Sequence, residues 1–329
     1  MRSLSKSKLL SFRQCPKRMW LEIHRRELGA DSAGALARFA AGHTVGELAR
    51  QIYDPEGVGE LLDPQAEGYE GALLRSRALM QAAQPRPIFE AGFSTERLLA
   101  FADVMLPVRN RTGRAWQMIE VKSATSVKDY HRDDVAIQAF AARQAGVPIA
   151  SVTLAHIDNS WTYPGGGDYG GLLKQVDLTQ EATEREPEVM VWLEAAHKVA
   201  NKRTEPKRMT GSHCSDPFEC SFNAYCRSQE PQAEYPIAWL PRIQTKALRE
   251  CIANGAVKDL REVPDDLLNE RQRRVKTHTL SNSVYFDAVG AAQDLAASKL
   301  PAYFLDFETV QFAVPIWKGT PGMDAQVCG

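Results

Sequence analysis

The sequence lacks any unbroken run of about 20 apolar residues, the length that a membrane-spanning helix needs. Its N-terminal residues are basic but contain no continuous apolar core, so a secretory signal is excluded as well. These two absences predict a cytoplasmic protein with no membrane contact. The chain also contains no internal repeat and no low-complexity tract, so repeat architectures are excluded.

An excess of either charge is also missing, because 40 basic and 41 acidic residues leave a net charge of −1. The overall charge therefore gives no support for a nucleic-acid partner. Basic residues are nevertheless concentrated in residues 1–26, 197–208 and 271–276. Such clusters can neutralise phosphates, or they can be ordinary solvated surface, and the sequence leaves both interpretations open.

Length and apolar content are ample, since 329 residues with 44% hydrophobic side chains can form more than one domain with a sizeable core. Hydrophobic residues recur first at helical spacing and later at the spacing of strands, so we expect an α/β fold. The predicted helices are 5–28 (interrupted at Cys15-Pro16), 33–53, 71–83, 132–145 and 180–200, and the predicted strands are 87–93, 98–106, 115–121 and 149–157.

The composition changes after Cys226. Residues 228–240 have the character of a linker, residues 241–285 carry short helical signals, and residues 302–305 form a predicted strand. We therefore expect a first domain over 1–235, a small helical segment over 236–300, and the start of a further domain over 301–329.

Three side chains on two neighbouring predicted strands form the main candidate site. Glu120 and Lys122 are two positions apart and therefore point to the same face of their strand. Asp103 can reach that face from the neighbouring strand. Two carboxylates offer the hard oxygen ligands that Mg²⁺ or Mn²⁺ prefers, and such a metal can polarise a phosphoryl oxygen and lower the pKa of a bound water. Lys122 can orient or deprotonate that water, or stabilise charge on the phosphate.

An acid and a lysine two positions apart also occur often as a solvated surface pair. Against this alternative, Asp103 lies in an otherwise apolar strand, where an unpaired carboxylate is costly. Asp103, Glu120-Val121-Lys122 and, on the next helix, Gln138 together resemble the PD-(D/E)XK nucleases in their RecB-like form. The resemblance implies a restriction-endonuclease-like core, with a mixed central sheet flanked by helices. It also implies catalytic roles for Asp103, Glu120, Lys122 and Gln138.

Two further positions bear on this resemblance. RecB-like nucleases carry a histidine on an early helix that contributes to the metal site, and His43 fits that position; the alternative is a surface histidine paired with Glu47. The glutamine motif often ends in tyrosine, but here residues 138–142 contain only Phe140 as an aromatic residue. The implied ligands of Mg²⁺ or Mn²⁺ are His43, Asp103, Glu120 and the carbonyl of Val121.

Cysteines are few but clustered, and Cys214, Cys220 and Cys226 follow one another with five residues between each pair. Clustered cysteines in a cytoplasmic chain indicate a metal or cluster site rather than disulfides. With the distant Cys15 they supply the four thiolates that a [4Fe–4S] cluster or a structural zinc needs. The short spacing usual for zinc is absent, His213 is an alternative ligand, and buried thiols without a metal are the simplest alternative.

One N-terminal and three C-terminal cysteines resemble the arrangement in iron–sulfur RecB-like nucleases, which include the CRISPR-associated spacer-acquisition exonucleases. The resemblance implies a [4Fe–4S] cluster on Cys15, Cys214, Cys220 and Cys226 that ties the first helix to the end of the nuclease domain. Cys251 and Cys328 have no partners in the sequence and are expected to be structural.

The C-terminal segment contains a second, shorter acidic motif. Asp306 and Glu308 follow a predicted apolar strand and resemble the first motif of DnaQ-like exonucleases, which have the RNase H-like fold. The further acids of such a site are absent, so we expect a truncated and inactive second site. The order of the parts is similar to that of an uncharacterised bacterial family, and residues 236–285 vaguely resemble a helix–hairpin–helix segment.

These observations predict a metal-dependent DNA nuclease. The expected reaction is hydrolysis of phosphodiester bonds, as an exonuclease on single-stranded ends, in repair or defence. One alternative is a DNA-binding or scaffold protein that retains the fold with weak or no catalysis. Another is an interaction protein held together by zinc.

Overall fold

The computed structural model describes residues 3–110, 113–253, 257–296, 298, 301, 303, 305, 306, 308–322 and 325–328. The chain divides into two compact units, each of which is described by itself. The first unit contains residues 1–208, 212–223 and 307–329, and the second contains residues 209–211 and 224–306. The division after residue 223 lies before the expected boundary at 235, and the C-terminal tail belongs to the first unit.

The first unit begins with two short helices in place of one long one. Strand β1 (Leu4–Ser5) leads into α1 (Lys6–Gln14), and α2 (Pro16–His24) follows directly. The hydroxyl of Ser5 caps α1 by accepting a hydrogen bond from the amide of Lys8 at 3.3 Å. Cys15 between the helices is extended, as expected for a residue that precedes proline. The predicted interruption at this point is confirmed.

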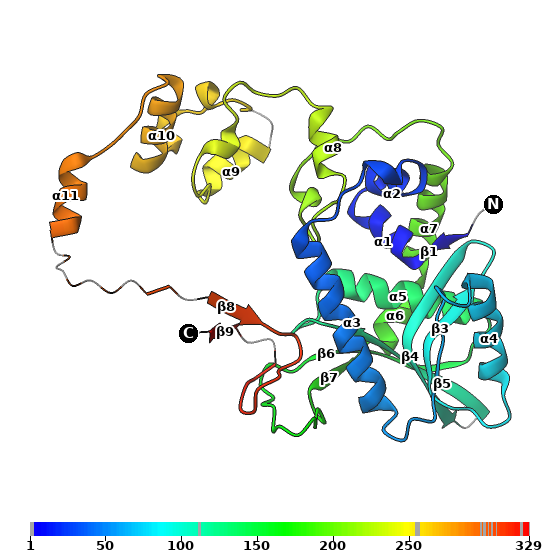
Figure 1. The fold of residues 1–329 in the computed structure, drawn as a ribbon. Helices are drawn as coiled ribbons and strands as arrows, with labels where there is room; N and C mark the ends of the chain where they lie inside the picture. Colours follow the sequence, from blue (N-terminus) through cyan, green and yellow to red (C-terminus); the bar gives the residue numbers. More distant parts are fainter. Residues whose placement is uncertain are drawn as a thin grey trace. The chain divides into compact units, whose positions relative to one another are not determined.

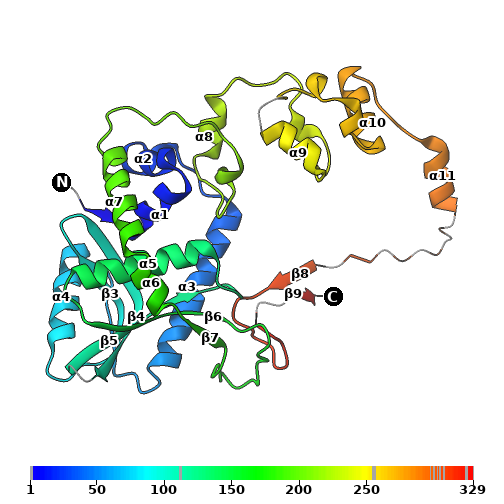
Figure 2. The same cartoon turned by 180° about the vertical axis from the view of Figure 1, so that it is seen from behind.

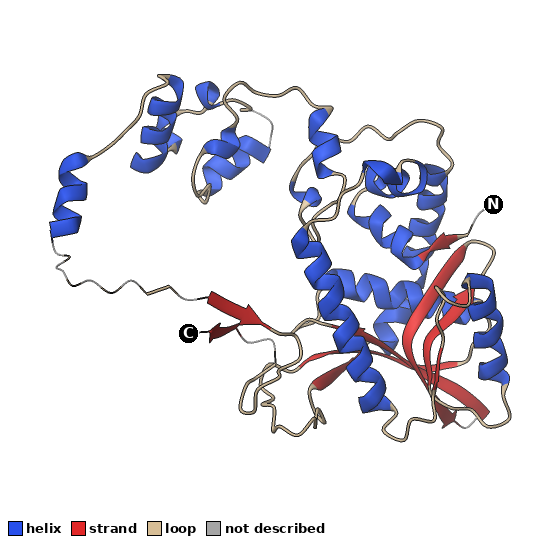
Figure 3. Ribbon diagram, viewed as in Figure 1, coloured by secondary structure: helices blue, strands red, loops and turns tan. Residues whose placement is uncertain are grey.

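A mixed, open sheet of seven strands forms the centre of the first unit (Figures 1 and 3). Its order is β2-β3-β4-β5-β6-β7, and β1 pairs with β4. Pairs β3–β4, β4–β5 and β6–β7 are antiparallel, whereas β1–β4, β2–β3 and β5–β6 are parallel. The strands are β2 (Glu60–Leu61), β3 (Ile88–Ser94), β4 (Leu98–Asn110), β5 (Gly113–Lys122), β6 (Ile149–Ile157) and β7 (Leu173–Asp177). The expected α/β class with a mixed sheet is confirmed, although β1, β2 and β7 were not predicted.

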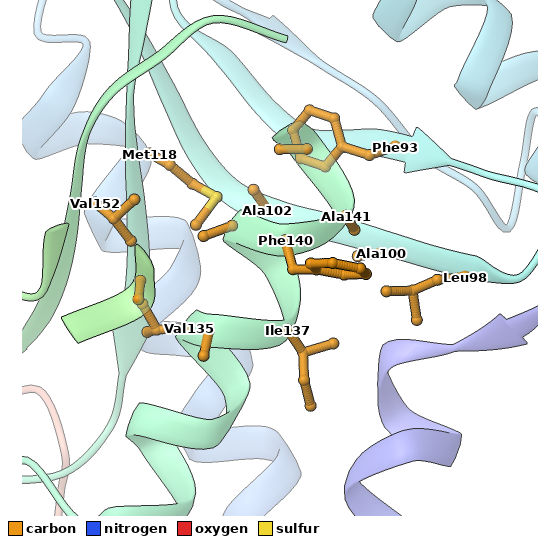
Figure 4. Close-up of a cluster of buried hydrophobic side chains, with 14 of the residues drawn as sticks. Phe93, Leu98, Ala100, Ala102, Met118, Val135, Ile137, Phe140, Ala141 and Val152 are labelled. Carbon is orange, nitrogen blue, oxygen red and sulfur yellow. The ribbon is translucent and has the colours of Figure 1, made fainter. Parts of the chain in front are cut away.

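Helices cover both faces of this sheet. The buried surface of α5 meets strands β3 to β6 in the main core, where four alanines of the helix are fully buried and permit close approach to the sheet (Figure 4). Helix α3 does not join this main core; its Val45 and Leu48 pack in a second cluster with Ile157 and Leu172. The helices are α3 (Ala33–Tyr53), α4 (Tyr69–Gln81), α5 (Asp129–Gln144), α6 (Thr179–Glu184) and α7 (Glu186–Ala200). The prediction of one helix over 180–200 is wrong, because the helix is interrupted at Arg185 and two helices form instead.

The tail of the chain returns to the glycine-rich loop that follows β6 (Figure 2). The amide of Tyr163 donates to the carbonyl of Thr320 at 3.0 Å, and the amide of Gly319 donates to the carbonyl of Tyr163 at 2.9 Å. Strands β8 (Glu308–Gln311) and β9 (Ala325–Cys328) form a separate antiparallel pair. The strand predicted over 302–305 is not found at 303 or 305, and 302 and 304 lie outside the described residues.

The second unit is helical and has a small core of its own. Its buried side chains include Ile237, Leu248 and Leu260. Its elements are α8 (Asn223–Ser228, of which Asn223 belongs to the first unit), α9 (Lys246–Ala253), α10 (Glu270–Leu280), α11 (Ala288–Ala296) and three short 3-10 helices at 237–239, 260–262 and 265–267. In both units, no helix of the described residues combines the length and apolar character needed to cross a bilayer.

Candidate active site

Three carboxylates lie in one row across the middle of the sheet. Glu90 on β3 and Asp103 on β4 lie between the register pairs Phe89–Val104 and Ala91–Ala102, and the charges of the two acids interact. The register of β4 with β5 begins at Val104 and Ile119, next to Asp103 and Glu120, and the charge of Asp103 acts on Glu120. The three neighbouring strands therefore bring the two predicted acids together and add Glu90, which the sequence did not predict.

The main-chain amide of Val121 fixes the orientation of Asp103. It donates a hydrogen bond of 2.7 Å to Oδ2 of the aspartate. This bond crosses from β5 to β4, so it ties the aspartate to the strand that carries Glu120 and Lys122. The expected partnership of Asp103 with the Glu120–Lys122 pair is thereby present in the geometry.

Two lysines reach the row of acids from different elements. Nζ of Lys122 bridges Glu120 on its own strand and Asp134 on α5. Nζ of Lys6, at the first position of α1, lies 3.0 Å from Oδ1 of Asp134 and 3.4 Å from Oε1 of Glu120. In the sequence, Asp134 lies within the predicted helix 132–145 and Lys6 lies within the basic segment 1–26. Neither position has a local pattern that marks it as part of this site.

Gln138 completes the site from α5. Its Nε2 donates to Oε2 of Glu120 at 2.5 Å and to Oδ1 of Asp134 at 3.0 Å. The two residues of α5 are one turn apart, so both face the sheet. Gln138, which the sequence resemblance includes in the motif, thus contacts Glu120 through a direct hydrogen bond between buried side chains.

Crowding of acids in a buried place changes their protonation. The pKa of the Glu120 carboxyl is raised to about 7, first by burial and then by the charges of Asp103 and Asp134, while Lys122 and Lys6 oppose the change. Burial likewise raises the pKa of Asp103, against the effect of the two lysines. Glu90 also has a raised pKa, first through burial and then through repulsion from Glu120. These three acids would gain from an additional positive charge.

Asp134 and the two lysines behave differently. Burial opposes ionisation of Asp134, yet the ammonium groups of Lys122 and Lys6 hold the pKa of this carboxyl well below its usual range. Burial would lower the pKa of Lys122, but Asp134, followed by Glu120, raises it well above its usual value, and the same acids raise that of Lys6. Lys122 is therefore protonated at neutral pH, so it can donate hydrogen bonds but cannot serve as a base in this state.

Glu90 adopts an unusual backbone conformation, with a φ of 57° in the middle of a strand. A positive φ costs energy in a residue with a side chain, and such strain is concentrated at functional sites. The signal that could have identified Glu90 is the one that identified Asp103, namely a lone acid in the apolar stretch Ile88–Phe93.

The donor chemistry fits a divalent cation with several water ligands. Among the described residues, no group of three or more His, Cys, Asp or Glu side chains is placed to hold a metal ion by itself. Mg²⁺ commonly uses only one or two carboxylates and keeps its remaining waters, and Asp103 with Glu120 supplies that number. In addition, Oε1 of Gln138 is buried with no hydrogen-bond partner, as expected for an atom that faces a bound water.

His43 is not brought into this site. It lies on an exposed face of α3 with 78% of its side chain accessible, and its Nε2 is 3.4 Å from Oε1 of Glu47. The alternative interpretation, a surface pair one helical turn apart, therefore describes the geometry. Phe140 is 6% exposed in the main core, and Ala142, where the related motif has tyrosine, is fully buried.

Three of the four predicted cluster cysteines lie in one region of the first unit, where the charges of Cys214 and Cys15 act on Cys220, but in the described part of the chain they are not placed to hold a metal ion by themselves. Cys15 and Cys220 are buried, and burial raises the pKa of the Cys220 thiol, with smaller contributions from Cys214 and Cys15. Sγ of Cys214 lies 3.7 Å from Nε2 of His213, the alternative ligand. Cys226 is buried on α8 and belongs to the second unit.

Hydrogen bonds connect this cysteine-containing loop to the N-terminal helices. Nε2 of Gln14 donates to the carbonyls of His213 at 2.8 Å and Phe218 at 2.7 Å. The hydroxyl of Ser32 donates to Glu219 at 2.6 Å. Hydrogen bonds therefore connect the first helix to the end of this domain, and the connection through a [4Fe–4S] cluster stays a prediction.

The structure does not show how the two acids of the second predicted site, Asp306 and Glu308, are arranged. Asp306 lies outside regular structure at the end of the second unit, and the side chain of Glu308 lies outside the described residues. Most basic side chains of the N-terminal segment 1–26 are paired with acids of the first unit. Four of its cations form ion pairs with Glu22, Asp133 and Glu205, and Lys6 lies in the site itself; the four are Lys8, Arg13, Lys17 and Arg18.

Comparison with known proteins adds no family assignment, because neither a scan against protein-family models nor a search of curated proteins finds a match to this chain.

Proposed function

We propose that this protein is a metal-dependent nuclease that hydrolyses phosphodiester bonds in DNA. The observation that carries the proposal is the row of Glu90, Asp103 and Glu120 on three neighbouring strands, where their charges interact, with Lys122 bound to Glu120. Acids that repel one another, next to a protonated lysine, suit a cation and a phosphate better than a purely structural core, where unpaired charge is costly.

Each side chain has a distinct part in this proposal. Asp103, oriented by the amide of Val121, and Glu120, oriented by Gln138, would hold Mg²⁺ or Mn²⁺. The bound metal supplies a polarised phosphoryl oxygen and a water of lowered pKa. Lys122 donates hydrogen bonds to the water or the phosphate and stabilises negative charge there. Its raised pKa favours this role over the other one considered from the sequence, removal of a proton from the water.

The topology supports a restriction-endonuclease-like core. An antiparallel β3-β4-β5 meander is followed by α5 and the parallel strand β6, and the candidate residues lie on β4, β5 and α5 in the expected order. Mixed sheets of many families have such a crossover, so the argument for the fold rests on where Asp103, Glu120, Lys122 and Gln138 lie within it.

We also propose a [4Fe–4S] cluster as a structural element. Cys15, Cys214 and Cys220 are close enough for their charges to interact, and Cys226 is the fourth ligand on the basis of the sequence resemblance. Its role is to hold the N-terminal helices, and with them Lys6, against the rest of the first unit. No redox step is assigned to it.

The test is cleavage of end-labelled single-stranded DNA with Mn²⁺ or Mg²⁺. Glu120→Gln and Lys122→Met should each reduce the rate by about 100-fold or more, because removal of one transition-state donor commonly costs that much. DNA binding should persist in both variants. Labels at the 5′ and 3′ ends would report polarity, and EDTA should abolish cleavage.

The exposed pair Glu194 and Lys198 on α7 supplies matched controls. Glu194→Gln and Lys198→Met make the same chemical changes on the surface and should cleave like the unmodified protein. Undiminished cleavage by Glu120→Gln or Lys122→Met would refute the proposed site. An unmodified protein that binds DNA but does not cut it under any metal condition would favour the non-catalytic alternative.

A further inference from the structure

The second unit contains a pocket of about 700 Å³ that the nuclease site does not use. It is lined by residues 235 and 239, by one side of α10, and by the loop 282–285 that follows this helix. All of these residues belong to the second unit. A volume of this size is typical of sites for small ligands or for a few units of a polymer.

The charged lining of the pocket is cationic. Arg271 and Arg274 contribute to its wall together with His278, and no carboxylate does. Arg274 is paired with Glu270 at 3.0 Å, but within the described part of the chain the side chain of Arg271 has neither a hydrogen bond nor an ion pair. An unpaired guanidinium beside a pocket is suited to an anion, and phosphate matches its geometry.

Aromatic rings make up the rest of the recognition surface. Trp239 is 54% exposed and Tyr285 is 45% exposed, although both belong to a side-chain class that is usually mostly buried. The guanidinium of Arg274 lies 4.2 Å from the centre of the Tyr285 ring, which holds that ring in place beside the cation. Exposed rings next to arginine side chains, one of them unpaired, are the combination that binds unpaired bases and their phosphates.

We propose that this pocket binds a single strand of nucleic acid, with a base stacked on Trp239 and phosphates held by Arg271 and Arg274. In this proposal the basic segment 271–276 binds phosphates and is more than a solvated surface. Binding at this pocket needs no catalysis, so it can be measured separately from the nuclease site.

The experiment uses the full chain in EDTA, with a fluorescein-labelled oligothymidylate and fluorescence anisotropy as the readout. Trp239→Ala should weaken binding by about fivefold or more, because stacking of one base contributes on that scale. The double variant Arg271→Ala with Arg274→Ala should weaken binding and reduce the slope of log Kd against log salt by about 1.4, the value for two lost phosphate contacts on a single strand.

Arg273→Ala is the matched control, since Arg273 is exposed on the same helix but does not line the pocket. It should bind as the unmodified protein does, and thermal unfolding should be the same for all variants. Equal binding by oligouridylate would support recognition of bases and phosphates common to DNA and RNA. Unchanged binding by Trp239→Ala and the double arginine variant, an equal loss with Arg273→Ala, or stronger binding of duplex DNA would overturn the proposal.

Discussion

The unusual feature at the scale of single residues is how many buried charges share one place. Glu120 is only 2% exposed, yet it contacts two ammonium groups and an amide. Removal of one member of such a network leaves the others uncompensated, which is more costly than loss of a surface pair. The charges of this site therefore influence both stability and chemistry.

Stability should consequently depend on pH through Glu120. The pKa of its carboxyl is about 7 in the folded protein and near 4.5 in the unfolded protein, so the folded state binds the proton more strongly. The favourable contribution of this proton is complete below about pH 4.5 and is lost as pH rises through about 7. A difference of this size corresponds to about 3 kcal/mol. Thermal unfolding in EDTA should show a larger loss of stability between pH 5 and 8 for the unmodified protein than for Glu120→Gln.

Two further measurements test the origin of this effect. Glu194→Gln, at an exposed acid, should retain the pH dependence of the unmodified protein. Mg²⁺ should reverse the loss at pH 8 in the unmodified protein, because a cation stabilises the ionised carboxylates, and should do so less in Glu120→Gln. Identical pH profiles for both proteins would show that Glu120 is not the group responsible.

At the scale of secondary-structure elements, packing between a helix and a strand positions the site. Helix α4 packs on β3 at Gly92, whose amide donates to the buried hydroxyl of Ser76 at 2.8 Å. A Cβ at this glycine would lie 2.7 Å from Cε1 of Phe101 and 2.9 Å from Cδ2 of Leu73. Because Gly92 is two residues from Glu90, this close contact supports the strand that carries the first acid of the row.

Gly92→Ala should therefore lower the free energy of unfolding by about 1–3 kcal/mol, the usual cost of overpacking. Gly42→Ala is the contrasting change, since this glycine is inside α3 and a Cβ there has no neighbour within 4 Å. It should raise stability by about 0.5–1 kcal/mol through helix propensity. Denaturant unfolding of both variants measures the two values. A neutral Gly92→Ala would indicate that the neighbouring side chains move aside without cost.

At the scale of the whole molecule, the structure joins segments that are far apart in the chain. Gln14 bonds to residues about 200 positions later, and the tail at 313–322 packs on the loop after β6. The cysteines are likewise far apart in the chain but close in the structure, with Cys15 near Cys214 and Cys220. A cluster on these thiolates would reinforce contacts that already exist.

Protein purified without oxygen should accordingly contain iron and sulfide, and Cys220→Ser should lose most of both. Cys251→Ser is the control, because Cys251 lies on α9 of the second unit and is no predicted ligand. Loss of the cluster should also lower the unfolding temperature and reduce nuclease activity by releasing Lys6. Colourless protein with stoichiometric zinc would instead favour a zinc site, and metal-free protein would favour buried thiols.

The sequence by itself determined the local elements and the central residues. Periodicity gave helix 33–53 and strand 149–157 at their observed bounds, and spacing gave the Glu120–Lys122 pair. These features depend on neighbours within a few positions, which a sequence displays directly. Only the tertiary structure placed Lys6, Glu90 and Asp134 with that pair, because strand register and helix packing bring them together across long separations. It likewise separated His43 from the site, because the face of α3 on which this residue lies is set by the buried contacts of Val45 and Leu48.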